Sequence, residues 1–153
     1  MNITRPRSIA ASAAVIGTLA VSAVALVPGV AAAGDRAACA GKVVHATQHS
    51  QTLYGTACSD TFYVGAFSNV TVQAGDGNDT VRAGFGGGTA YLYLGNGNDV
   101  VLNPNDRSVW VLAGAGNDVL EGSSGYDAFY GGSGTDSATI TVGDFYDGIE
   151  IYL

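Results

Sequence analysis

Three stretches of the sequence share one pattern: QAGDGNDTV (Gln73–Val81), YLGNGNDVV (Tyr93–Val101) and LAGAGNDVL (Leu112–Leu120). Each places Gly-x-Gly-Asn-Asp ahead of a short apolar run. A single Asp-Gly or Asn-Gly between apolar segments indicates a tight turn, in which glycine supplies a positive φ. A hairpin turn gives no reason for an aspartate that always stands last. The spacing of the copies therefore decides the fold.

The aspartates that close these turns recur at a nearly fixed interval. Asp79, Asp99, Asp118 and Asp136 are separated by 20, 19 and 18 residues, and Asp60 precedes the first of them by 19. Self-similarity at such a period is typical of repeat architectures, in which each repeat stacks on the last. We call the turns that end at Asp79, Asp99, Asp118 and Asp136 the strong turns.

Weaker turns lie midway between the strong ones. Antiparallel hairpins would make every turn chemically similar, whereas a parallel coil stacks strong turns on one edge and weak turns on the other. The alternation therefore predicts an all-β parallel β-roll or β-helix with about 19 residues per coil. The weak turns are GAFSNV (65–70), GFGGGTA (84–90), NPNDRSV (103–109) and GSSGYDA (122–128).

The strands that flank the strong turns alternate between apolar and other residues, with the period of two that a half-buried strand shows. The columns expected to face inward are Val70, Ala90 and Val109; Val72, Leu92, Val111 and Phe129; and Val81, Val101, Leu120 and Ala138. The columns expected to face outward are Thr71, Tyr91, Trp110 and Ala128, and Gln73, Tyr93, Leu112 and Tyr130.

Five in-phase segments resemble the glycine- and aspartate-rich nonapeptide of the RTX (repeats-in-toxin) family, whose pattern G-G-x-G-x-D-x-U-x marks calcium-binding β-helix repeats. Only the last has both leading glycines. The resemblance spans roughly residues 55–142. The segments are AGDGNDTVR (74–82), LGNGNDVVL (94–102), AGAGNDVLE (113–121), GSSGYDAFY (122–130) and GGSGTDSAT (131–139).

The residue types suit Ca²⁺, which prefers six to eight hard oxygens from carboxylates and carbonyls. Glycines let the backbone direct several carbonyls to one spot. The resemblance implies that each ion lies between two stacked strong turns, in the pairs Asp79–Asp99, Asp99–Asp118 and Asp118–Asp136. The implied ligands are these aspartates with the backbone of Gly75, Gly77, Gly95, Gly97, Gly114, Gly116, Gly132 and Gly134.

Two further aspartates are weaker candidates. Asp60 follows Ala57 and Cys58, which disturb its turn, and Asp127 stands opposite Ser108 when the weak turns are aligned. A β-helix can also be built without ions. Four carboxylates stacked at coil spacing would then repel each other by about 1 kcal/mol or more per pair. We therefore expect folding to be coupled to calcium binding.

The first 33 residues have the features of a cleaved secretory signal peptide. Two arginines precede an apolar, alanine-rich run, and a small-residue cleavage site ends near Ala33. A membrane anchor is the alternative, since the run is long enough to span a bilayer. The mature chain (34–153) is expected to be extracellular, with no membrane span.

Without that leader, the chain has four basic side chains and all 13 acidic ones, which gives a formal net charge of −9. Such a surface disfavours nucleic acid and attracts cations. In an oxidising compartment, Cys39 and Cys58 are expected to form a disulfide. It would tie an N-terminal cap (34–54) to the repeats (55–142), and residues 143–153 would supply a C-terminal capping strand.

We expect no enzymatic activity, because the paired carboxylates lie in turns and no nucleophile–base arrangement remains. His45 and His49 invite a zinc site but have no acidic partner nearby, so cap or surface roles are favoured. An alternative function is adhesion or binding of a glycan or protein through an exposed aromatic face. That face would comprise Tyr91, Tyr93, Trp110 and Tyr130, with Leu112 between them.

Overall fold

The computed structural model describes residues 39–153, so the expected signal peptide (1–33) lies outside the described residues. Every regular element in the described part is a β-strand, and the strands form two sheets. The seven-stranded sheet has the order β1 (Val43–His45), β3 (Thr61–Tyr63), β5 (Thr80–Arg82), β7 (Val100–Leu102), β9 (Val119–Glu121), β11 (Ser137–Thr139) and β13 (Ile151–Tyr152). The six-stranded sheet has the order β12 (Phe145–Asp147), β10 (Ala128–Ser133), β8 (Val109–Ala115), β6 (Ala90–Asn96), β4 (Thr71–Asp76) and β2 (Thr52–Tyr54).

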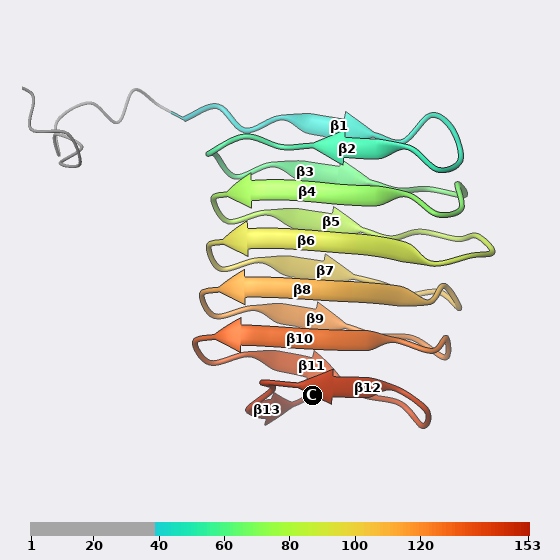
Figure 1. The fold of residues 1–153 in the computed structure, drawn as a ribbon, viewed down its shortest axis with the longest axis vertical. Helices are drawn as coiled ribbons and strands as arrows, with labels where there is room; N and C mark the ends of the chain where they lie inside the picture. Colours follow the sequence, from blue (N-terminus) through green and yellow to red (C-terminus); the bar gives the residue numbers. More distant parts are fainter. Residues whose placement is uncertain (1–38) are drawn as a thin grey trace, which may run out of the picture. The chain divides into compact units, whose positions relative to one another are not determined.

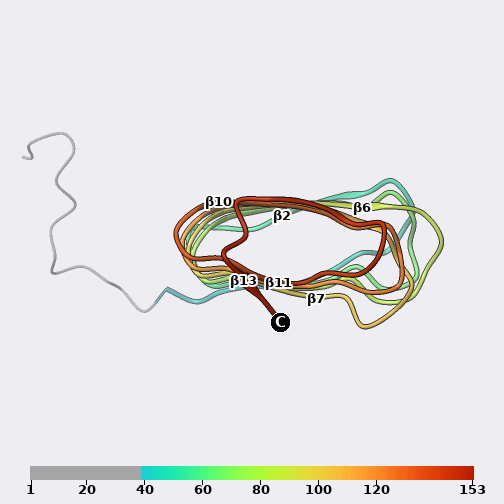
Figure 2. The same ribbon diagram turned by 90° about the horizontal axis from the view of Figure 1, so that it is seen from below.

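Neighbouring strands are parallel, and each pairs with the strand two places along the chain. Thr71 pairs with Tyr91 and Tyr91 with Trp110, while Thr80 pairs with Val100 on the opposite sheet. The chain therefore winds as a flattened coil, with one strand of each sheet per turn (Figures 1 and 2). The predicted all-β parallel β-roll with about 19 residues per coil is confirmed.

The two edges of the coil differ, as the alternation of turns predicted. The strong turns connect β4 to β5, β6 to β7, β8 to β9 and β10 to β11, on the left in Figure 1. The weak turns lie on the opposite edge. Viewed along the coil, the strong turns overlay closely and the weak turns splay apart (Figure 2). We call these sides the strong edge and the weak edge.

The core is the thin layer between the two sheets. The three expected inward columns are buried, including Val72, Leu92 and Phe129, which have no exposed surface. Ala74, Leu94 and Ala113 extend this layer toward the strong edge. Burying a Val, Leu or Phe side chain contributes roughly 1.5–3 kcal/mol, and the same columns repeat in successive coils.

One expected equivalence at a weak turn is wrong. Ala128 pairs with Trp110, as in the expected outward column, so Asp127 stands opposite Val109 and not opposite Ser108. The cause is that this coil has 18 residues, as the bond from the Val109 N–H to Asp127 Oδ1 shows. The assignment of Ser108 as the equivalent of Asp127 was wrong by one residue.

Both ends of the described chain lie on the coil. Cys39 and Cys58 form the expected disulfide, with Cα atoms 5.4 Å apart. Residues 43–54, within the segment expected as a cap, form the first coil through β1 and β2, and residues 145–152 supply β12 and β13. In the part of the chain that the structure describes, no helix is long and apolar enough to cross a membrane.

Candidate metal centre

The strong edge is built on two columns of glycines with positive φ. Gly95 and Gly97 have φ values of 105° and 143°, and the equivalent glycines of the other strong turns lie in the same range. A Cβ on Gly97 would lie 1.7 Å from the carbonyl oxygen of Gly77, and one on Gly95 would lie 1.9 Å from that of Gly75. Carbonyl oxygens of one turn therefore point at the next turn, at a distance that only glycine permits.

The aspartates of successive turns form a ladder. In each step the Oδ1 atom of one aspartate accepts a hydrogen bond from the backbone N–H of the aspartate one coil earlier. The last aspartate, Asp136, donates its N–H to Glu150 Oε2 at 2.8 Å. The other steps are Asp60 N–H to Asp79, Asp79 N–H to Asp99 and Asp99 N–H to Asp118, each at 2.7 Å, and Asp118 N–H to Asp136 at 2.8 Å.

The second carboxylate oxygen of each strong turn is buried without a partner. The residues themselves are at most 1% exposed. Buried polar atoms are nearly always hydrogen-bonded, so an unpaired one in a fold calls for an explanation. The atoms concerned are Oδ2 of Asp79, Asp99, Asp118 and Asp136.

This environment changes the acidity of the carboxyls. Burial raises the pKa of Asp79 to about 6 and that of Asp99 to about 7, partly offset by the backbone hydrogen bond that each accepts. The neighbouring carboxylates raise both values further. Burial also raises the pKa of Asp118. The edge therefore resists full ionisation unless positive charge is supplied.

Asp60 and Asp127, the two weaker candidates, are bonded differently. Asp60 Oδ2 accepts the N–H of Thr56 at 2.5 Å, and Asp127 Oδ2 accepts the N–H of Ser123 at 2.9 Å. Their Oδ1 atoms accept the N–H groups of Lys42 and Val109. Both carboxylates are thus satisfied by the protein itself, unlike those of the strong turns.

An asparagine ladder runs beside the aspartates, and the sequence reasoning missed it. Asn78 Oδ1 accepts the N–H of Asn98 at 2.9 Å, Asn98 Oδ1 that of Asn117 at 2.8 Å, and Asn117 Oδ1 that of Thr135 at 2.9 Å. These bonds satisfy turn N–H groups that no strand reaches. The available signal was the constant asparagine before each aspartate in the three quoted stretches.

The atoms at the strong edge fit a hard cation. They are carboxylate oxygens without a donor and glycine carbonyl oxygens directed between coils, which is the ligand chemistry of Ca²⁺. In residues 39–153, no three His, Cys, Asp or Glu side chains are grouped to hold a metal ion. A cation at this edge must therefore draw much of its coordination from the backbone.

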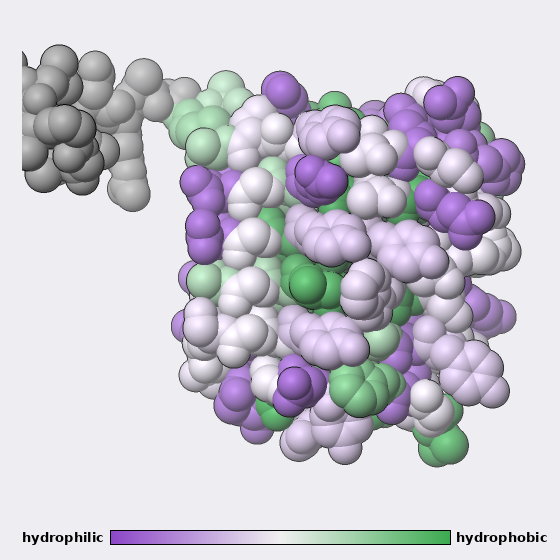
Figure 3. Space-filling view, viewed as in Figure 1, coloured by the Kyte–Doolittle hydropathy of each residue, from purple (hydrophilic) through white to green (hydrophobic). Residues whose placement is uncertain are grey.

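The face of the six-stranded sheet carries the expected aromatic cluster. Trp110 makes edge-to-face contacts with Tyr91, Tyr93 and Tyr130, with ring centroids 5.9–6.2 Å apart. Tyr91 and Tyr93 are 36% and 37% exposed. The rings gather over the middle of the face that Figure 3 shows.

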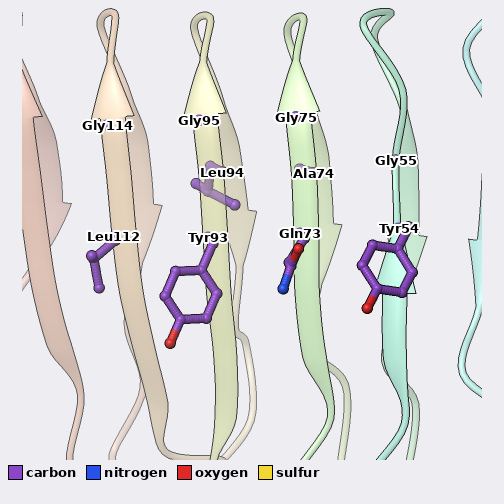
Figure 4. A pocket seen from close by; sticks show the side chains of 10 residues that line it. All are labelled: Tyr54, Gly55, Gln73, Ala74, Gly75, Tyr93, Leu94, Gly95, Leu112 and Gly114. Atoms are coloured by element: carbon purple, nitrogen blue, oxygen red, sulfur yellow. The ribbon is translucent and has the colours of Figure 1, made fainter.

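Beside these rings a shallow groove of about 580 Å³ crosses β2, β4, β6 and β8. Its floor is a glycine strip that includes Gly75, Gly95 and Gly114, and Tyr54 and Tyr93 stand in a row along it (Figure 4). Gln73 and Leu112 complete this row. None of the ten lining residues is charged.

A parallel coil whose glycine turns stack along one buried acidic edge has the architecture of a calcium-binding β-roll. Residues 110–138 match the family model described as RTX calcium-binding nonapeptide repeat (4 copies). The resemblance to the RTX family is thereby confirmed for residues 110–138, and RTX nonapeptide repeats bind Ca²⁺. No curated protein and no solved structure matches the chain.

Proposed function

We propose that this chain is a secreted calcium-binding scaffold whose repeats complete their folding when Ca²⁺ binds between the strong turns. The observation that carries the proposal is the column of four buried Oδ2 atoms without partners. The RTX match at residues 110–138, which include Asp118 and Asp136, supports it. The disulfide is compatible with an extracellular location.

In this proposal the ladder positions the ligands before the ion arrives. The Asp99 side chain is fixed by the N–H of Asp79, which leaves its Oδ2 free for a cation. The same holds for Asp79, Asp118 and Asp136, and carbonyls of the turn glycines would complete the shell. A bound Ca²⁺ would supply the positive charge that offsets the stacked carboxylates. One turn alone has too few oxygens for a full shell, so the ligands of one ion would come from two coils.

Two features restrict this role to the strong edge. Asp60 and Asp127 already have protein donors on both carboxylate oxygens, so neither needs a cation. We therefore propose that the ions lie only between the turns of Asp79, Asp99, Asp118 and Asp136. The scaffold acts by binding and not by catalysis.

Far-UV circular dichroism of the chain, with millimolar Ca²⁺ and with excess chelator at neutral pH, tests the coupling. We expect the β signal to fall when calcium is removed and to return when it is restored. Mg²⁺ at the same concentration is the control cation, because it demands a smaller octahedral shell. An unchanged β signal in chelator would contradict the proposal.

A second candidate function, adhesion through binding of a glycan, is favoured by the uncharged groove and its tyrosines. Tyr54 and Tyr93 present rings and hydroxyls along a glycine floor, and a neutral sugar chain needs both stacking surfaces and hydrogen bonds. Replacing Tyr93 and Trp110 by serine should abolish retention on neutral polysaccharide while calcium-dependent folding persists. Retention equal to that of the unmodified chain would exclude this function.

A further inference from the structure

Arg107 is an arginine in the interior of the weak edge. Its sequence context, NPNDRSV, is that of an exposed polar loop, yet the residue is 1% exposed. Isolated buried charges are very costly unless polar groups surround them. Burial lowers the pKa of the guanidinium, as desolvation does for any buried base.

The guanidinium is held by carbonyl oxygens of two earlier weak turns. Nη2 donates to the carbonyl of Gly65 at 3.0 Å and to that of Phe85 at 3.2 Å. These residues precede Arg107 by 42 and 22 positions, so one side chain links three successive coils. Nε and Nη1 have no hydrogen-bond partner among the described residues, so no carboxylate there accepts a bond from them.

The surrounding weak turns are shaped for this side chain. A Cβ on Gly86 would lie 2.4 Å from Nη2, so only glycine leaves room for the guanidinium. The loop that carries Arg107 is closed by Asn103, whose Nδ2 donates to the Arg107 carbonyl at 2.7 Å. The guanidinium therefore occupies a site that the neighbouring weak turns have room to hold.

We propose that the Arg107 guanidinium is the resident cation of the weak edge, where it neutralises inward-facing turn carbonyls as a metal ion would on the strong edge. The strong edge depends on a cation from solution, whereas the weak edge carries its own. The bonds from Arg107 to the weak turns of Gly65 and Phe85 consequently need no ion from solution. The contrast with the strong edge rests on the proposed calcium function, but the role of Arg107 does not.

Chemical rescue tests this role. In Arg107→Ala, amides of the weak turns at 65–70 and 84–90 should exchange with solvent at least about tenfold faster, because charged hydrogen bonds are lost. Free guanidinium, added far below denaturing concentration, should restore protection. Urea is planar, of similar size and neutral, and should not. Arg82→Ala, which removes an arginine exposed on β5, should leave these amides unchanged.

Every outcome bears on the proposal. Rescue by guanidinium alone supports it, whereas rescue by both compounds, or by neither, shows that charge is not what the site needs. If Arg107→Ala fails to fold, the same additions are scored by recovery of the β signal in circular dichroism. Failure of the unmodified chain to bind calcium would overturn the proposed function but would leave the rescue result intact.

Discussion

The backbone N–H of Asp79 donates to Oδ1 of Asp99 at 2.7 Å, across 20 residues of chain. This bond joins two coils through a side chain at the point where the backbone turns and strand pairing stops. The two oxygens of the Asp99 carboxylate therefore differ, because Oδ1 accepts a hydrogen bond from the neighbouring turn and Oδ2 has no partner.

Asp99 stands between two other aspartates in the ladder, whereas Asp136 has one aspartate neighbour and Glu150 on its other side. Asp99→Asn should therefore remove more bound calcium than Asp136→Asn, because it touches two proposed pairs instead of one. Asn can still accept the Asp79 N–H, so the coil is retained. Isothermal titration calorimetry with direct metal analysis measures the stoichiometry.

Asp127→Asn is the matched control for that comparison. Its carboxylate is satisfied by Val109 and Ser123, so calcium stoichiometry should not change. Equal loss of calcium in Asp99→Asn and Asp127→Asn would contradict the assignment of the ions to the strong edge.

Without calcium, the stability of the fold should rise on acidification. The pKa values of Asp79 and Asp99 are raised from 3.8 to about 6 and about 7, so the folded state binds protons more tightly than the unfolded chain. Their favourable contribution is fully present below about pH 4 and is lost as the pH rises through 6 to 7. The far-UV circular dichroism signal for β structure in chelator should therefore be larger at pH 5 than at pH 8, and urea unfolding at pH 5 measures the stability of the folded state.

The calcium-loaded chain should show the opposite trend over the same range, because protons compete with the cation for the same oxygens. Calcium affinity at pH 5 should be weaker than at pH 8. A calcium affinity independent of pH would mean that these carboxylates are not ligands.

Gly97→Ala should be strongly destabilising. Its Cβ would lie 1.7 Å from the Gly77 carbonyl oxygen, and its φ of 143° is rare for residues with a side chain. We expect a loss of roughly 2 kcal/mol or more in the free energy of unfolding. Gly87→Ala is the control, since its Cβ would have nothing within 4 Å. Urea unfolding in calcium should show a change of about 0.5 kcal/mol or less for the control.

Removal of the disulfide should loosen only the first coil. Cys39 and Cys58 are 19 residues apart, and a bridge over such a loop contributes about 3 kcal/mol on the chain-entropy model. In Cys39→Ser/Cys58→Ser, residues 43–54 should exchange amide hydrogens faster, whereas β8 and β10 should be unaffected. This follows because strand pairing joins each coil only to the next, and β8 and β10 lie three and four strands from β2 in their sheet. Uniformly faster exchange would show that the bridge stabilises the whole coil.

The period of the strong turns was sufficient to predict most of the fold. Because Asp79, Asp99 and Asp118 recur at coil spacing, the inward columns that include Val72 and Leu92 could be predicted before any contact was known. The closing aspartates could also be placed on one edge. The residues of the inward columns face the core because side chains alternate between the two faces of a strand, which is a local property of the sequence.

Other features depend on contacts between distant coils and could not be predicted. The division of each carboxylate between a backbone N–H and a free oxygen is set by the exact stacking of neighbouring turns. The burial of Arg107 requires Gly86, which lies 21 residues earlier on another coil. The bond from the Val109 N–H to Asp127 Oδ1 could not be predicted either, although the expected column that contains Trp110 and Ala128 already implied this register.

The ladder also has a direction, which bears on the order of assembly. Each carboxylate bonds to the turn before it, so the N–H of Asp79 is satisfied only once Asp99 has been placed, and that of Asp136 only by Glu150. A chain made from its amino end adds, with every new coil, the acceptor that the preceding coil still lacks. Assembly can therefore proceed vectorially, with Glu150 as the terminator that ends the series.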